Sequence, residues 1–185
     1  ISNARILILG GGGREHAFAW ALVNDVNVAK VYCAPGNGGT HEIAENVDLD
    51  ASNHYAVIEF VRLNNIDLTI VGPEAPLADG IVDSFHKVGL PIFGPDKYAS
   101  QLESSKLFAR DMMAKYNVPI PKYYACKNSD EVDLVKVKLE LPLVLKADGL
   151  AAGKGVMVCT TEAEYEAGLT TMFDENAFGD AGAKV

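Results

Sequence analysis

Short apolar runs that end at glycine or proline recur along the N-terminal part of the chain. Residues 5–9 read Arg-Ile-Leu-Ile-Leu and are followed by four glycines, and further apolar runs cover residues 28–34, 68–71 and 90–94. Continuous apolar runs, in contrast to alternating ones, are typical of parallel strands that are buried on both faces. We therefore expect these segments to be the strands of a parallel sheet.

Helical patterns alternate with these runs, over residues 15–23, 55–64 and 81–88. The side chains of the first helix that are available to pack against the sheet are those of Ala17, Phe18, Ala21 and Leu22. Alternation of strand and helix predicts an α/β domain with a Rossmann-like parallel sheet. We place this domain at residues 1–102.

The alternation then changes. Residues 104–116 predict a helix, N-capped by Ser104 or Ser105, and the prolines within residues 118–122 predict a hinge after it. The side chains expected on the buried side of this helix are those of Leu107, Phe108, Met112 and Met113. We assign residues 103–120 to a connecting helix and hinge.

Residues 121–185 predict a smaller α+β unit, with helices at 129–139 and 162–173 around a strand, a glycine-rich loop and a second strand. About 65 residues are few for an independent hydrophobic core. We therefore expect this unit to be incomplete and the natural chain to continue beyond Val185.

Composition excludes several classes of function. The net charge of −9 and the absence of a basic run argue against a nucleic-acid partner, and no apolar run is long enough to cross a bilayer. The cysteines Cys33, Cys126 and Cys159 are few, far apart and in apolar surroundings, which is typical of reduced core residues in a cytoplasmic protein. The histidines show no metal-ligand spacing with them, so no metal site is predicted in the chain.

The segment between the last two predicted strands is a candidate phosphate-binding loop. Gly149, Gly153 and Gly155 let backbone N–H groups turn toward an anion, and Lys146 and Lys154 bring positive charge to the same place. The spacing does not fit the P-loop, which requires more residues between its glycines, a hydroxyl residue after the lysine and a following helix. An ordinary glycine-rich hairpin with exposed lysines is the alternative interpretation.

The glycines after the first strand do not form a dinucleotide fingerprint. If Gly10 and Gly12 are its first two glycines, Glu15 occupies the third position, and the second strand ends without the acidic residue that binds a ribose. NAD is therefore not predicted. The amides of Gly11 and Gly13 at a helix N-terminus can still hold a phosphate, assisted by Arg14, or the glycines only allow close strand–helix packing.

Other polar positions fall on the same edge of the predicted sheet. Asn37 and Gly38 lie in a second glycine-rich loop after a strand, and Glu74 follows the strand at 68–71. Glu74 suits hydrogen bonds from sugar hydroxyls or an amine, but it also suits the positive end of a helix. Lys106 opposes the dipole of its own helix, so it is either solvated or positioned for an anionic ligand.

Taken together, these motifs resemble the ATP-grasp superfamily, and within it the phosphoribosylamine–glycine ligase (glycinamide ribonucleotide synthetase) family. The motifs that carry the resemblance, in order along the chain, are residues 10–17 (GGGGREHA), 35–40 (PGNGGT), 72–77 (GPEAPL), 105–106 before a Phe-Ala helix, and 146–156 (KADGLAAGKGV). By this resemblance the fold is a pre-ATP-grasp domain followed by a truncated first lobe of an ATP-grasp domain.

The resemblance implies a cytoplasmic enzyme of purine biosynthesis that joins 5-phosphoribosylamine to glycine, using ATP and Mg²⁺ and passing through glycyl phosphate. It implies ATP-binding roles for Lys106, Lys146, Gly149, Gly153, Lys154 and Gly155. It implies that the phosphoribosylamine site is formed by Gly11, Gly12, Gly13, Arg14, Asn37, Gly38 and Glu74.

No catalytic residue is assigned within the chain, because the resemblance places the magnesium ligands and much of the adenine and glycine sites beyond Val185. We therefore expect the chain alone to be inactive. Two alternatives stay open: another ATP-grasp ligase, such as a formate-dependent transformylase or a biotin carboxylase, and a non-catalytic module that binds a phosphosugar or a nucleotide. The sequence predicts neither the oligomeric state nor fusion to other enzymes.

Overall fold

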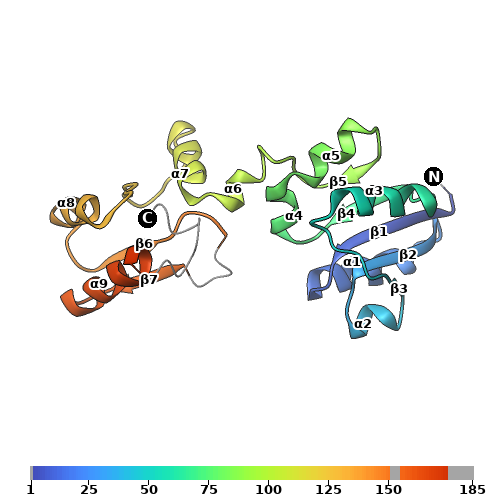
Figure 1. Cartoon of the computed structure of the whole chain (residues 1–185), viewed down its shortest axis with the longest axis horizontal. Coiled ribbons are helices and arrows are strands. Elements are labelled where there is room, and N and C mark those ends of the chain that lie inside the picture. Colours follow the sequence, from blue (N-terminus) through green and yellow to red (C-terminus); the bar gives the residue numbers. More distant parts are fainter. Residues whose placement is uncertain (1, 151–154, 175–185) are drawn as a thin grey trace. The chain divides into compact units, whose positions relative to one another are not determined.

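The computed structural model describes residues 2–150 and 155–174. Its contacts divide the chain into two compact units, Ile1–Ser100 and Gln101–Val185 (Figure 1). We call them unit 1 and unit 2 and describe each by itself.

Unit 1 is built on a five-stranded sheet with the order β3-β2-β1-β4-β5, in which every neighbouring pair is parallel. The strands are β1 (Ala4–Gly10), β2 (Val28–Pro35), β3 (Glu45–Asn46), β4 (Leu68–Val71) and β5 (Ile92–Phe93). The α/β class and the Rossmann-like parallel sheet expected from the sequence are confirmed.

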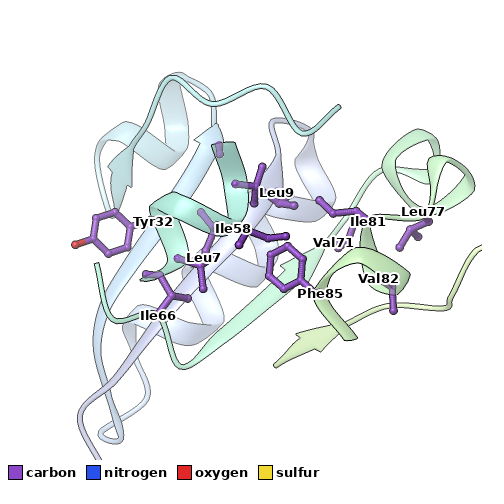
Figure 2. Close-up of a cluster of buried hydrophobic side chains, with 13 residues drawn as sticks. Leu7, Leu9, Tyr32, Ile58, Ile66, Val71, Leu77, Ile81, Val82 and Phe85 are labelled. Carbon is purple, nitrogen blue, oxygen red and sulfur yellow. The ribbon is translucent and has the colours of Figure 1, made fainter. Parts of the chain in front are cut away.

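Each face of the sheet has its own hydrophobic core, because successive side chains of a strand point to opposite faces. Ile6 and Ile8 of β1 pack with Ala19 of α1 (Gly13–Val23) on one face. Leu7 and Leu9 lie on the other face, in the cluster drawn in Figure 2. That cluster is completed by α3 (His54–Leu63), α4 (Glu74–Asp79) and α5 (Ile81–Lys87). The sheet is therefore covered on both faces, as its unbroken apolar strands require.

The buried side of α1 matches the predicted one in part. Phe18 and Leu22 pack against the core of this face, as predicted. Ala17 and Ala21 are exposed, whereas Ala19 is fully buried and Glu15 is 4% exposed. The helix is rotated in this way because the carboxylate of Glu15 reaches back beneath the glycine turn that precedes the helix. A polar side chain thus occupies a position on the face that the sequence pattern assigned to apolar residues alone.

Two short helices, α2 (Gly38–His41) and α4, stand where the sequence analysis predicted no helix, whereas α5 matches the helix expected at residues 81–88. The N-cap of α2 is the side chain of Asn37. Farther along, α4 and α5 are separate helices because Gly80 between them adopts a left-handed conformation, with φ +98°. The break leaves Glu74 in the first turn of its own short helix, directly after β4.

Unit 2 contains an antiparallel pair of strands, β6 (Leu143–Lys146) and β7 (Val156–Cys159). The helices are α6 (Gln101–Ser104), α7 (Lys106–Lys115), α8 (Ser129–Leu139) and α9 (Glu162–Leu169), and α9 continues into the π-helical turn η1 (Thr170–Asp174). One face of the strand pair packs on α8 and α9 through a core that contains Leu143, Leu145, Val132, Tyr165 and Met172.

The helix before the proline-rich segment is less buried than its apolar pattern predicts. Ala109 is the buried residue of α7, Leu107, Phe108 and Met112 are half-buried, and Met113 is exposed. Ser105 is the N-cap, and its hydroxyl accepts a hydrogen bond from the Phe108 N–H at 3.1 Å. The α+β character expected for this part of the chain is confirmed by β6, β7 and the helices around them.

Candidate functional site

The carboxyl ends of β1 and β4 lie side by side at the middle of the sheet in unit 1, where Leu9 pairs with Val71. The chain runs from β1 toward β2 on one side, whereas β4 and β5 lie on the other. Such a reversal of strand order opens a crevice at the carboxyl edge of a parallel sheet, and ligands bind there in folds of this class. The turns that form this edge are residues 10–13 and 72–74.

A buried carboxylate supports both turns. Oε2 of Glu15 accepts a hydrogen bond from the Gly12 N–H at 2.6 Å. A Cβ atom at Gly10 would lie 2.7 Å from Cγ of Glu15, and one at Gly72 would lie 1.9 Å from its Oε1. Glycine is required at both positions because any side chain would overlap this carboxylate.

The second glycine-rich loop is joined to the first by Asn37. Its Nδ2 donates to the Gly11 carbonyl at 3.0 Å, while its Oδ1 accepts from the N–H groups of Gly39 and Thr40 at 2.8 and 2.9 Å. The amide of Asn37 is therefore engaged in holding the two loops together. This loop can therefore bind a ligand through backbone N–H and C=O groups, such as those of Gly38.

The side chains of Arg14 and Glu74 connect the turns after β1 and β4. Nη2 of Arg14 donates to Oε1 of Glu74 at 2.9 Å, and both side chains are partly exposed. This hydrogen bond is the main reason that the pKa of Glu74 lies below its usual value. The pair places one positive and one negative group at the crevice, beside the N-terminus of α1.

The backbone at the start of α1 has free space beside it at Gly13. A Cβ atom added at Gly13 would meet nothing within 4 Å, and the same is true of Gly38. Gly13 is the first residue of an eleven-residue helix, where N–H groups point along the axis and the helix dipole is positive. The structure thus brings Gly11, Gly12, Gly13, Arg14, Asn37, Gly38 and Glu74 to one edge of unit 1.

In unit 2, Lys106 and Lys146 line the same cavity, which has a volume of about 360 Å³. Lys106 begins α7 and Lys146 ends β6, so residues far apart in sequence meet there. Arg110, Lys122 and Lys136 also line this cavity, although Lys136 forms an ion pair with Glu162. A hollow with several cationic groups and an apolar wall suits an anionic ligand that also has an apolar part.

The glycine-rich loop between β6 and β7 is described at its two ends. Gly149 has φ +107°, and its carbonyl accepts a hydrogen bond from Nζ of Lys106 at 2.8 Å. Gly155 is buried, and its carbonyl accepts from the Ala147 N–H at 2.9 Å. Gly153 and Lys154 lie outside the described residues.

Two residues with close contacts to these groups were not singled out by the sequence analysis. Glu15 was considered only as a misfit to a glycine fingerprint, and Asp148 was quoted only within a longer motif. An acidic residue directly after a glycine-rich turn is a signal for a carboxylate that binds backbone N–H groups. Asp148 accepts from the Leu107 N–H at 3.1 Å, across the start of α7.

The three cysteines are buried and free of disulfides, as the sequence predicts. Burial raises the pKa of Cys33 to about 11 and also raises the pKa values of Cys126 and Cys159. Nucleophilic chemistry by these thiols is therefore not supported.

Within residues 2–150 and 155–174, no group of three or more His, Cys, Asp or Glu side chains is arranged to hold a metal ion. Within the same described part, no helix is both long enough and apolar enough to span a membrane.

Comparison with known proteins covers both units. Residues 4–103 match the N domain of phosphoribosylglycinamide synthetase, and residues 104–185 match the ATP-grasp (A) domain of the same family. A phosphoribosylamine–glycine ligase of Neisseria meningitidis serogroup B is 51% identical over 98% of this chain. The chain spans 43% of that relative's length.

Solved structures agree on the fold. The crystal structure of a phosphoribosylamine–glycine ligase from Thermotoga maritima superposes with a TM-score of 0.73 at 30% identity, over 95% of this chain and 41% of that one. An N5-carboxyaminoimidazole synthetase from Staphylococcus aureus, complexed with ADP, gives a TM-score of 0.70 at 17% identity, over 92% and 44% of the two chains. The second likeness shows the fold alone.

Proposed function

The chain belongs to the phosphoribosylglycinamide synthetase family, and from that premise we propose that it is the N-terminal part of an ATP-dependent ligase that joins 5-phosphoribosylamine to glycine. The products are glycinamide ribonucleotide, ADP and phosphate. The enzyme works in the cytoplasm, in purine biosynthesis. Family membership disfavours the other ATP-grasp ligases considered from the sequence.

The main observation that supports this proposal is that Lys106 and Lys146 line the same cavity in unit 2. Phosphoryl transfer depends mainly on positioning and on compensation of phosphate charge. Two ammonium groups from different elements can bind oxygens of different phosphates of ATP. Gly149 follows closely after Lys146 in sequence, and its carbonyl accepts a hydrogen bond from Lys106. The glycine-rich loop that begins there is proposed to contribute backbone N–H donors to the same phosphates.

The reaction proceeds in two balanced steps. A carboxylate oxygen of glycine attacks the terminal phosphorus of ATP, the bond to the bridging oxygen breaks, and ADP leaves. The amine of phosphoribosylamine then attacks the carbonyl carbon of glycyl phosphate, phosphate leaves, and the nitrogen loses a proton. The lysines bind and orient phosphate throughout these steps.

The crevice of unit 1 is proposed to bind phosphoribosylamine. The phosphate of the sugar lies at the amides of Gly11 and Gly13, with Arg14 as counter-charge. The Gly12 N–H donates to Glu15, so Gly12 acts by shaping the turn. Glu74 accepts hydrogen bonds from the ribose or from the amine. Asn37 acts by holding its loop against the glycine turn, and Gly38 contributes its backbone.

ATP-grasp enzymes use magnesium, which compensates phosphate charge when it is bound. The described residues provide no group of three or more acidic, histidine or cysteine side chains that fits a metal ion. The magnesium ligands are proposed to lie in the part of the full-length relatives that this chain does not cover.

A coupled assay of ADP release tests the proposal. The product of the whole gene is expected to release ADP only when glycine, phosphoribosylamine and ATP are all present. The 185-residue chain is expected to be inactive in the same assay. Absence of glycine-dependent ADP release from the whole product would contradict the proposed reaction and would favour a non-catalytic binding module. Glycine-dependent turnover by the short chain would contradict its assignment as an incomplete enzyme.

Substrate roles are separated by two variants of the whole gene product. Glu74→Gln is expected to raise KM for phosphoribosylamine and to leave KM for ATP unchanged. Lys146→Ala is expected to do the reverse. Lys87→Ala, on the exposed end of α5, is the matched control for loss of a lysine. Equal effects of Glu74→Gln on both substrates would contradict the assignment of the crevice.

A further inference from the structure

Asp148 lies where the chain leaves β6, between Lys146 and Gly149, and its side chain is bound to the start of α7. Its Oδ1 accepts a hydrogen bond from the Leu107 N–H at 3.1 Å. The hydroxyl of Ser105 lies 3.2 and 3.1 Å from its two carboxylate oxygens and donates to them. A residue of the phosphate loop is therefore fixed to the first turn of a helix about forty positions earlier in the sequence.

The position suits a carboxylate for two reasons. The first N–H groups of a helix lack partners within the helix, and the helix dipole is positive there. Ser105 also caps α7, because its Oγ accepts from the Phe108 N–H at 3.1 Å. The same hydroxyl thus accepts from the helix and donates to Asp148, which links the cap and the carboxylate into one unit.

A second bond runs in the opposite direction. Nζ of Lys106, the first residue of α7, donates to the carbonyl of Gly149 at 2.8 Å. A lysine in this position is repelled by the dipole of its own helix, and Asp148 brings a negative charge to the first turn of that helix through its bond to the Leu107 N–H. An ammonium group has three donors, so Lys106 can hold Gly149 and still bind a phosphate oxygen.

We propose that Asp148 is a positioning residue that holds Lys106 and the start of the loop at Gly149 in the arrangement that binds the phosphates of ATP. It acts through Lys106 and does not touch the nucleotide, since its oxygens are engaged by Ser105 and Leu107 and its charge repels phosphate. The inference rests on the proposed function, in which Lys106 binds ATP.

The test is a double-mutant cycle on the affinity of the whole gene product for ATP in the presence of magnesium, measured by titration calorimetry. Asp148→Asn removes the charge and keeps the shape, and Lys106→Met removes the ammonium. Each single change is expected to weaken binding about tenfold or more, as loss of a charge-assisted hydrogen bond does. The double variant is expected to bind no more weakly than Lys106→Met alone, because both changes disable the same group.

Rescue and control variants separate positioning from general stability. Ser105→Thr retains the hydroxyl and is expected to bind ATP within about twofold of the wild type, whereas Ser105→Ala weakens binding. Asp130→Asn removes a carboxylate from the first turn of α8, where it is exposed, and is expected to change nothing. The thermal midpoint of each variant is recorded, and affinity is measured well below it.

The outcomes are distinguishable. Additive losses in the cycle would overturn the inference, because Asp148 would then act independently of Lys106. A lowered thermal midpoint with unchanged affinity in Asp148→Asn would overturn it as well, since the role would be structural only. Failure of the wild-type protein to bind ATP would overturn the proposed function and the inference together, whereas either of the first two results leaves the proposed function standing.

Discussion

The carboxylate of Glu15 and the backbone of Gly72 are in such close contact that a methyl group on Gly72 would lie 1.9 Å from Oε1. Glu15 belongs to α1, and Gly72 follows β4. The contact therefore fixes the glycine turn after β1 against the turn after β4. The proposed sugar-phosphate site depends on this packing beneath it.

Gly72→Ala is accordingly expected to lower the free energy of unfolding by about 3 kcal/mol, because the added methyl group overlaps a buried carboxylate. Urea unfolding followed by circular dichroism measures the effect. Gly13→Ala is the matched control, since a Cβ atom there meets nothing within 4 Å. It is expected to be neutral or to stabilise by about 0.5 kcal/mol. Equal losses for the two variants would contradict the packing described for Glu15.

The Arg14–Glu74 ion pair predicts a small, pH-dependent contribution to stability. The folded-state pKa of Glu74 lies below its ordinary value because Arg14 donates to the carboxylate. The contribution is therefore present above the unfolded-state pKa and is lost as the pH falls through the folded-state pKa.

A double-mutant cycle of Arg14→Ala and Glu74→Ala is expected to give a coupling free energy of about 0.5 kcal/mol near neutral pH, reduced because both groups are partly exposed. Urea midpoints measured at about pH 7 and about pH 3 are expected to show a smaller coupling at the lower value, because Glu74 is then closer to protonation. An undiminished coupling at the lower pH would show that the pair is held by something other than the charge of Glu74.

Lys146→Ala is expected to weaken ATP binding more than AMP binding, because we propose that its ammonium binds the phosphates that ATP has and AMP lacks. The expected loss for ATP is about tenfold or more. Lys127→Ala is the control, since Lys127 is exposed and does not line the cavity. Competition with a fluorescent ATP analogue gives both affinities, and equal losses for ATP and AMP would contradict the assignment.

Tyr165→Phe is expected to destabilise unit 2. The Tyr165 side chain is fully buried, which is the main reason that its pKa is raised. Its hydroxyl donates to Oδ1 of the exposed Asp133 at 2.6 Å, and this bond raises the pKa further. Loss of this partly buried hydrogen bond to a charged group costs about 1.5 kcal/mol. Thermal unfolding measures this loss, and Tyr55→Phe, at an exposed position in unit 1, is the control. A larger loss in the control would contradict the role of this bond.

Much of the fold follows from sequence because β1, β2, β4 and β5 are mainly apolar runs that end at or just before glycine or proline. The polar strand β3, Glu45–Asn46, was not predicted because it has no apolar pattern. The rotation of α1 did not follow, since periodicity counts apolar residues and Glu15 is a carboxylate on the buried face. The break between α4 and α5 depends on Gly80 in a left-handed conformation, which the pattern of apolar residues does not reveal.

For the candidate site too, some residues could be predicted from the sequence and others could not. Glycines and lysines near strand ends could be picked out, because backbone freedom and positive charge are properties of single residues. Asp148 and Asn37 act through partners distant in sequence, and their roles appear only when the elements are packed. Asn37 was expected to bind substrate, whereas its side chain here joins two loops.

The buried thiols can report local unfolding of each unit through their rates of alkylation. Cys33 lies in unit 1, and Cys126 and Cys159 lie in unit 2, all of them shielded from reagents in the folded state. Alkylation at each sulfur must wait for the surrounding core to open, so the rate at each cysteine reports the local stability of its own unit. Mass spectrometry of peptides from one labelling experiment would read the two units separately, without an added probe.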